Sequence, residues 1–274
     1  MPHAAYIAIP LVAAAAIAAF IIHDRLPSKA QANAERPPLV GRPYLFPNKL
    51  PDSLAILTPP PAQGSPEMKR DLDARQSALK LRNTPRYVLA TSDSKRNQLS
   101  TVQAFTCALD TDISQERTPE LFRILEAMRV DVRASTYPAK ARFRRPQPFE
   151  IYHSNTCSPA DEQLVKGAGN YPDARAAVGW AYALVLSEIE PARTEAIMQR
   201  GREFGQSRTI CDAAWQSDVD AGVSLATQVV IRLRQDKNFL ADLNAAKAEV
   251  AAELRAGVKP QRECRAETAA LAMR

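Results

Sequence analysis

Basic side chains gather in one short stretch of this 274-residue chain. Lys140, Arg142, Arg144 and Arg145 stand almost side by side. Ammonium and guanidinium groups bind carboxylate and phosphate oxygens through charge-assisted hydrogen bonds, so this cluster is a candidate anion site. Alternate arginines on a helix can equally form a solvated face, and both interpretations stay open at this point.

Histidine is scarce in the sequence, which limits the acid-base chemistry that the chain can perform. The 3 histidines are His3, His23 and His153, and the first two lie in an N-terminal segment outside the expected folded body. A reaction that uses one histidine as nucleophile and another as general acid needs two such side chains. His153 alone cannot fill both roles, and its segment IYHSNTCSPAD predicts a surface loop.

Three short blocks follow one another in a fixed order. They are KARFRRPQPF from Lys140, PDAR at 172–175, and SRTICDAAWQSD at 207–218. These blocks, with ALVLSEIEPAR and WQSDVDAG around them, resemble the class A bacterial non-specific acid phosphatases of the type 2 phosphatidic acid phosphatase and vanadium haloperoxidase superfamily. The resemblance extends over nearly the whole chain beyond about residue 40, so it supports the fold more firmly than the activity.

The resemblance implies a phosphohistidine mechanism whose reactive residues are exchanged in this chain. In the family a third-block histidine attacks phosphorus and an aspartate orients it; here Ala214 takes the first position and Asp218 the second. The family's second-block histidine protonates the leaving oxygen, and Arg175 stands in its place. A guanidinium keeps its proton near neutral pH, so both the nucleophile and the general acid are missing.

The phosphate-binding positions that the resemblance implies are kept in part: Lys140, Ser207 and Arg208, with Arg175 as an additional cation. After Lys140 and six intervening residues, Gln147 stands where the family has arginine. A gapped alignment would use Arg145 instead, and we favour the ungapped one because Pro-Phe then follows as in the family.

The family's phosphate-binding serine in the second block is replaced by Asp173. This carboxylate can oppose an incoming anion. It can also pair with Arg175 or Arg208 and close the site.

Three functions remain open from these residues. The first is an exported, catalytically impaired or inactive homologue that retains a site for phosphate or another small anion. The second is an active acid phosphatase that uses an activated water or Cys211, Asp212 or His153 as a substitute nucleophile. The third is a structural partner of an active paralogue, in a homo-oligomer or mixed oligomer. We expect no cofactor, no metal and no nucleic-acid binding, since the basic residues lack interleaved aromatic side chains.

Helical periodicity predicts an all-α protein, a single-domain bundle of the class A acid phosphatase type. Thr118 and Pro119 predict the start of one helix. Pro172 opens a second segment that is apolar on almost every side and should be central. Further amphipathic segments are expected at about 191–213, 217–235 and 238–256. Only 9 glycines and no strand-like alternation argue against a sheet protein.

The N-terminal region predicts export. The apolar run 4–22 is long enough to cross a bilayer, and the small residues at 30–34 offer cleavage sites, so 1–34 is expected to be a signal peptide or a membrane anchor. A Pro-rich extended lead should occupy 35–66 and the domain 67–274. The expected location is the periplasm, either secreted or anchored to the inner membrane by 4–22, and a net charge of +6 suits a small soluble envelope protein.

The 4 cysteines show no C-x-x-C spacing, so a structural zinc site is not expected. An even number in an exported chain favours disulfides, with four buried thiols as the alternative. Of three possible pairings we favour Cys157 with Cys211, which would flank the phosphate pocket that the resemblance implies, and Cys107 with Cys264.

Overall fold

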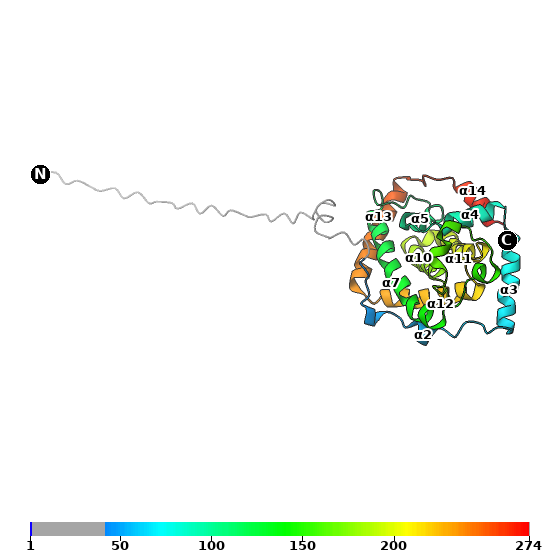
Figure 1. Cartoon of the computed structure of the whole chain (residues 1–274). Helices are drawn as coiled ribbons and strands as arrows, with labels where there is room; N and C mark the ends of the chain where they lie inside the picture. Colours follow the sequence, from blue (N-terminus) through cyan, green and yellow to red (C-terminus); the bar gives the residue numbers. More distant parts are fainter. Residues whose placement is uncertain (2–41, 274) are drawn as a thin grey trace. The chain divides into compact units, whose positions relative to one another are not determined.

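Helices make up the fold of the computed structural model, which describes residue 1 and residues 42–273 (Figure 1). Within that range the chain has no β-strand. The α-helices are α2 (Ser53–Ile56), α3 (Pro66–Leu79), α4 (Pro85–Ser94), α5 (Gln98–Gln103), α6 (Thr106–Leu109), α7 (Pro119–Phe143), α8 (Pro148–Tyr152), α9 (Glu162–Val165), α10 (Ala174–Ile189), α11 (Thr194–Ile210), α12 (Gln216–Leu233), α13 (Lys237–Arg255) and α14 (Cys264–Leu271). Short 3-10 helices lie at Pro47–Lys49, Pro159–Asp161 and Pro191–Arg193. The expected all-α single domain is confirmed.

Helix α10 lies at the centre of the bundle and packs against α7, α11 and α12. Its side chains are buried on nearly all faces, as its apolar sequence predicts. Small residues let α11 approach closely, since a Cβ built on Gly179 would lie 2.3 Å from the ring of Phe204. The five predicted helical segments correspond to α7, α10, α11, α12 and α13, each with ends close to those expected.

Residues 42–65 lie along the body of the domain instead of standing away from it. The backbone N–H groups of Tyr44 and Leu45 donate to the buried Asp131 carboxylate of α7 at 2.9 and 3.1 Å. The Tyr44 hydroxyl donates to Asp242 of α13 at 2.8 Å. Ser53 is fully buried and its Oγ accepts the Ala139 N–H of α7 at 3.1 Å. The described part of the lead therefore belongs to the packed domain.

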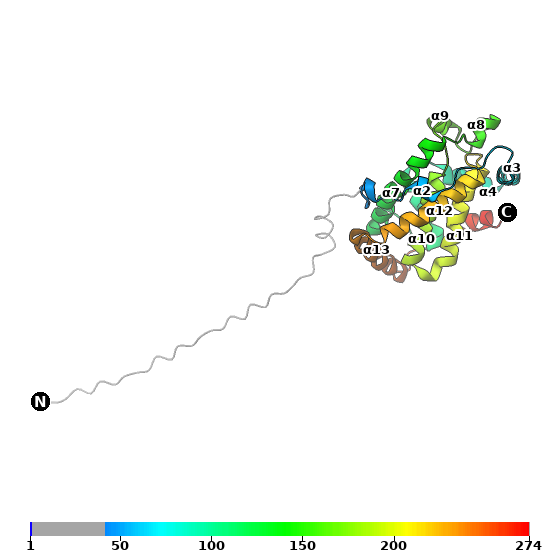
Figure 2. The same ribbon diagram turned by 90° about the horizontal axis from the view of Figure 1, so that it is seen from below.

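Two helices that the sequence patterns did not predict lie together at one end of the molecule. Figure 2 shows α8 and α9 beyond the C-terminal end of α7. The segment that carries them, 148–165, is rich in turns and has few buried apolar residues. Its short helices are held by tertiary contacts, such as the bond from the Phe149 N–H to the Asp212 carbonyl at 3.0 Å, which hydrophobic periodicity does not reveal.

Both favoured disulfides are present, Cys107–Cys264 and Cys157–Cys211. The first fastens the C-terminal helix α14 to α6, and the second joins the segment before α9 to the end of α11. Within residues 42–273 no helix is both long and apolar enough to span a bilayer. The predicted signal or anchor at 4–22 lies outside the described residues.

We expect the Cys107→Ser/Cys264→Ser variant to lose about 2–4 kcal/mol in free energy of unfolding, because the crosslink restrains a long loop in the unfolded chain. The two cysteines are 157 positions apart in sequence. Denaturant unfolding of the variant beside the parent protein, with Cys157–Cys211 intact in both, measures the difference. Identical midpoints and slopes would show that α14 needs no crosslink.

Candidate active site

Asp173 stands at the N-terminus of α10, at the centre of the predicted phosphate pocket. It is the N-cap residue, and its Oδ1 accepts the Ala176 N–H at 2.7 Å. Its own N–H donates to the Asp218 carbonyl at 2.8 Å, which ties α10 to the start of α12. Gly222 of α12 permits this approach, because a Cβ there would lie 2.5 Å from the Asp173 carbonyl oxygen. The third block thus folds directly against the second.

The Asp173 carboxylate is buried and surrounded by donors. Its Oδ2 accepts Arg208 Nε at 3.1 Å and Asn170 Nδ2 at 3.0 Å. Burial by itself would raise the pKa of Asp173, but the charges of Arg208 and Lys140 hold that pKa below its ordinary value. The positive end of the helix dipole favours the ionised form as well. Asp173 is therefore a charged, fully compensated carboxylate.

Lys140 lies beside this carboxylate near the end of α7. Its Nζ donates to the Gly169 carbonyl and to Asn170 Oδ1, both at 3.4 Å. Burial lowers the pKa of Lys140, and the nearby Asp173 charge opposes that change. Of the two cations that the resemblance assigns to phosphate, Arg208 thus pairs with Asp173 directly, and Lys140 acts on it through its charge while bonding to the neighbouring Asn170.

Ala214, the position at which the resemblance implies a nucleophile, lies among packed apolar side chains. Ala214 is 2% exposed and forms a small apolar cluster with Ala176 and Val219. Asp218, which would orient a histidine in the family, instead accepts Arg145 Nη1 at 2.7 Å and the Trp215 N–H at 3.1 Å. The second of these bonds caps α12. Asp218 therefore has a structural role in the site.

The Arg145 side chain is buried in the protein interior, unlike the other arginines of the basic cluster. Besides Asp218, its guanidinium binds Asp71 of α3 at 2.7 Å, and it lies 5.3 Å from the centre of the Trp215 ring. Arg142 and Arg144 are exposed. The gapped alignment would make Arg145 a phosphate ligand, but the structure places it between two carboxylates. The basic cluster therefore consists of two exposed arginines, one buried arginine that is paired with two carboxylates, and Lys140.

Gln147 closes one side of a small cavity next to Asp173. It is 2% exposed, and its Nε2 donates to the Val165 carbonyl at 3.2 Å and to Glu150 at 3.3 Å. The cavity has a volume of about 30 Å³ and is also lined by Arg175 and Arg208. A space of that size holds about one water molecule, which is less than a phosphate needs.

Arg175 points from the first turn of α10 toward the end of α4. Its Nη2 donates to the carbonyls of Lys95, at 3.0 Å, and Asp93. Its Nε is buried and has no hydrogen-bond partner. Burial, together with the neighbouring charge of Arg208, lowers the pKa of Arg175 to about 10. At neutral pH the group still carries its proton.

Ser207 is directed away from this cavity. Its Oγ donates to Asp93 at 2.6 Å and accepts Arg86 Nη1 at 3.0 Å, and Asp93 in turn accepts Arg200 Nη1 at 3.1 Å. Asp93, Arg86 and Arg200 were not predicted as site residues from the sequence. Arg200, Glu203 and Ser207 share one face of α11, so a polar row on an inward helix face is the signal that could have found this network.

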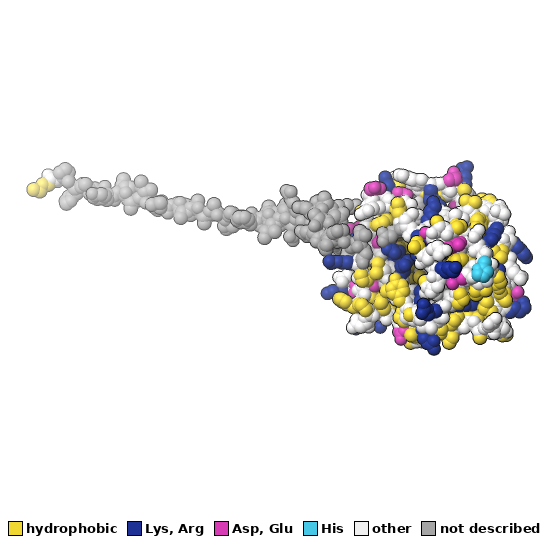
Figure 3. Space-filling view, in the orientation of Figure 1, with side chains coloured by type: hydrophobic (Ala, Val, Ile, Leu, Met, Phe, Trp, Pro, Cys, Tyr) yellow, Lys and Arg dark blue, Asp and Glu magenta, His cyan; other side chains and the backbone are white. Residues whose placement is uncertain are grey.

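The three substitute nucleophiles are engaged or remote from the cavity. Cys211 forms a disulfide. Asp212 accepts two bonds from Arg75, at 2.6 and 2.8 Å, and one from Ser154. His153 ends α8 on the surface, on the face drawn in Figure 3, where histidine is cyan and basic and acidic side chains are mixed. Residues 42–273 contain no His, Cys, Asp or Glu cluster suited to a metal ion.

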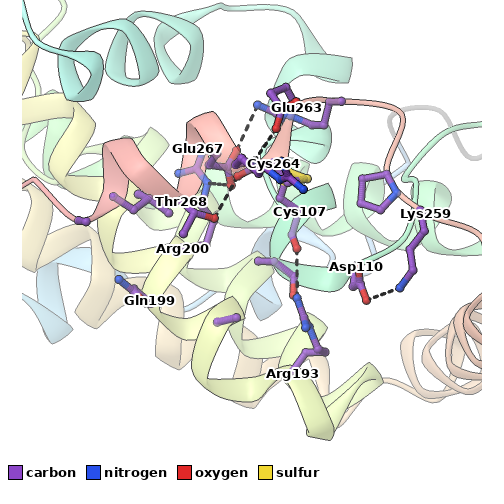
Figure 4. Close-up of a pocket in the computed structure, with 17 residues that line it drawn as sticks. Cys107, Asp110, Arg193, Gln199, Arg200, Lys259, Glu263, Cys264, Glu267 and Thr268 are labelled. Carbon is purple, nitrogen blue, oxygen red and sulfur yellow. Dashed lines mark hydrogen bonds and ion pairs between the residues drawn. A yellow bond between two sulfur atoms is a disulfide. The ribbon is translucent and has the colours of Figure 1, made fainter.

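A larger cavity of about 950 Å³ lies elsewhere, beside the Cys107–Cys264 disulfide (Figure 4). Its charged side chains are largely paired within the protein: Lys259 with Asp110 at 2.8 Å and Arg200 with Glu267 at 3.2 Å. None of the predicted site residues other than these two cysteines lines it.

Asp218 predicts a pH dependence of stability. Burial raises its pKa from 3.8 to about 7, against the opposing charge of Arg145. Between these values the folded state binds more protons than the unfolded state, so this group makes stability fall as pH rises. We expect the free energy of unfolding of the Asp218→Asn variant to decrease less steeply with pH, by about 1 kcal/mol per pH unit. Urea unfolding across that range tests this, and parallel pH profiles for the two proteins would contradict it.

Comparison with known proteins identifies relatives of this chain. It is 38% identical over 209 residues to a non-specific acid phosphatase of Providencia stuartii, covering 76% of this chain and 84% of that protein. It is 32% identical over 210 residues to a non-specific acid phosphatase of Salmonella typhimurium, covering 76% and 84%. An acid phosphatase of Zymomonas mobilis is 32% identical over 200 residues, covering 73% and 75%. No family model matches. The chain belongs to the non-specific acid phosphatase family.

Proposed function

We propose that this protein is an exported acid phosphatase homologue without effective phosphatase activity, whose phosphate pocket is occupied by its own Asp173. The observation that carries the proposal is the convergence of Arg208, Lys140 and the α10 N-terminus on that one carboxylate. Helix N-termini and paired cations are the groups that bind phosphate in proteins. An internal anion at this position takes the place of the substrate.

An external phosphate would have to displace Asp173 to reach these groups. The displacement breaks bonds from Arg208, Asn170 and the Ala176 N–H, each of which contributes about 1.5–3 kcal/mol when one partner is charged. A carboxylate that stayed in place would repel the phosphate dianion. Both effects weaken substrate binding in the unmodified protein.

The chemistry would also be slow once a phosphate ester was bound. Ala214 offers no nucleophile, and loss of the covalent route removes the two-step pathway. Arg175, with its pKa at about 10, cannot protonate a leaving oxygen near neutral pH. Loss of a general acid alone reduces rates by about 10²–10⁴.

The local contacts favour this proposal over an active enzyme with a substitute nucleophile. The Cys211 sulfur is held in a disulfide, and the Asp212 carboxylate is bound by Arg75 and Ser154. Two disulfides favour an oxidising compartment and so support the exported location.

Turnover of p-nitrophenyl phosphate tests the catalytic part of the proposal. We expect a rate at least about 10²-fold below that of the Providencia stuartii relative assayed in parallel. Lys140→Ala and Arg208→Ala serve as controls for contaminating phosphatase, which these substitutions would not affect. Turnover comparable to the relative and abolished by either substitution would show that the site is active.

The binding part is tested by Asp173→Ser, which removes the internal anion, adds space and keeps an N-cap side chain. We expect the variant to bind inorganic phosphate at least about tenfold more tightly than the parent by calorimetry, a gain of about 1.4 kcal/mol. Asp236→Ser is the matched control, because Asp236 caps α13. Equal phosphate affinity in the parent and Asp173→Ser proteins would contradict the occupied-pocket proposal.

A further inference from the structure

The two disulfides of the protein lie in contrasting surroundings. Cys107 and Cys264 are partly exposed and line the cavity of about 950 Å³, which is partly open to solvent (Figure 4). Cys157 and Cys211 are 8% and 1% exposed and pack within a small apolar cluster. Cys211 borders the cavity of about 30 Å³, which has room for about one water molecule. A small dithiol therefore has much readier access to the first disulfide.

The sulfur of Cys264 is well placed to depart as a thiolate. Cys264 is the first residue of α14, and a thiolate is stabilised at a helix N-terminus and beside cationic side chains. Five basic and three acidic side chains line the cavity, so its net charge is positive. Thiol–disulfide exchange is faster when the departing sulfur forms a stabilised thiolate. Attack at Cys107 with departure of Cys264 is therefore the favoured direction.

Helix α14 has few attachments to the rest of the domain besides this disulfide. It has 8 residues, and its buried residues are Glu267 and Ala270. Ala270 contributes only a methyl group to the packing. Glu267 Oε1 lies 3.2 Å from Arg200 Nε of α11. A helix of this length is not stable by itself in water, so α14 depends on the crosslink for its place.

The rest of the domain keeps its own contacts without α14. Arg200 also donates to Asp93 of α4 through Nη1 at 3.1 Å and to the Ala104 carbonyl through Nε at 3.0 Å. Its buried charge thus stays compensated when Glu267 is withdrawn. No described helix follows α14 in the chain. Detachment of α14 is therefore a local event and does not require the domain to unfold.

We propose that the Cys107–Cys264 disulfide is a redox-sensitive attachment, which a dithiol reduces to release α14 while Cys157–Cys211 stays oxidised. Release enlarges the cavity and exposes the Arg200 guanidinium. In an oxidising compartment the disulfide remains formed and α14 remains attached. The inference does not depend on the proposed function, because neither Asp173 nor a phosphate ester takes part.

The exchange proceeds in two steps that balance. One thiolate of the dithiol bonds to Cys107 Sγ, the bond between Cys107 and Cys264 breaks, and Cys264 departs as a thiolate that takes up a proton. The second thiol of the dithiol then loses its proton and displaces Cys107, which becomes the second thiol of the protein. The protein gains two electrons and two protons, and the dithiol is oxidised to a disulfide.

Reduction of the full chain by dithiothreitol under native conditions tests the accessibility of the two disulfides. Samples taken over time are alkylated, and peptide mass spectrometry measures the modified fraction of each cysteine. We expect Cys107 and Cys264 to be modified together, at least about tenfold faster than Cys157 and Cys211. The second disulfide is the matched control within the same molecule. Equal rates, or faster reduction of Cys157–Cys211, would overturn the proposal.

Hydrogen exchange of the selectively reduced protein tests the release of α14. We expect the amides of 264–271 to exchange at least about tenfold faster than in the oxidised protein, with the amides of α10 unchanged. The Cys107→Ser/Cys264→Ser variant should show the same pattern without reductant. Unchanged protection of 264–271 after reduction, or loss of protection in α10 together with α14, would contradict a local release.

Discussion

The structure of this site depends on one buried ion pair, Asp173 with Arg208. The carboxylate caps α10, its backbone N–H contacts the start of α12, and its charge partner comes from α11. Three helices therefore meet at one residue. A buried carboxylate is tolerated only where its charge is compensated and its oxygens are hydrogen-bonded, and both conditions hold for Asp173.

A second buried carboxylate of the candidate site is Asp218. Without a histidine to orient, this carboxylate would be an uncompensated buried charge. Arg145 binds it together with Asp71, so the charge is neutralised by a residue that the sequence places in a surface-like basic cluster. The raised pKa of Asp218 shows that the compensation is incomplete, because burial outweighs the attraction to Arg145.

The sequence predicted the long helices because their periodicity, N-caps and prolines all agree, as at Thr118–Pro119 and at Pro172 before α10. It did not predict which way Ser207 or Arg145 would point. Each lies within a motif whose spacing is kept, but its direction depends on partners far along the chain, Asp93 and Asp71. The short helices α8 and α9 in the segment 148–165 were not predicted for a similar reason, because tertiary contacts and the Cys157–Cys211 disulfide hold that segment.

A crystal structure of the full chain soaked in vanadate tests whether Asp173 occupies the phosphate position. We expect Asp173 to be bonded to Arg208, with no tetrahedral or bipyramidal oxyanion between Lys140 and Arg208. Vanadate bound between those two cations, with Asp173 displaced from Arg208, would contradict it.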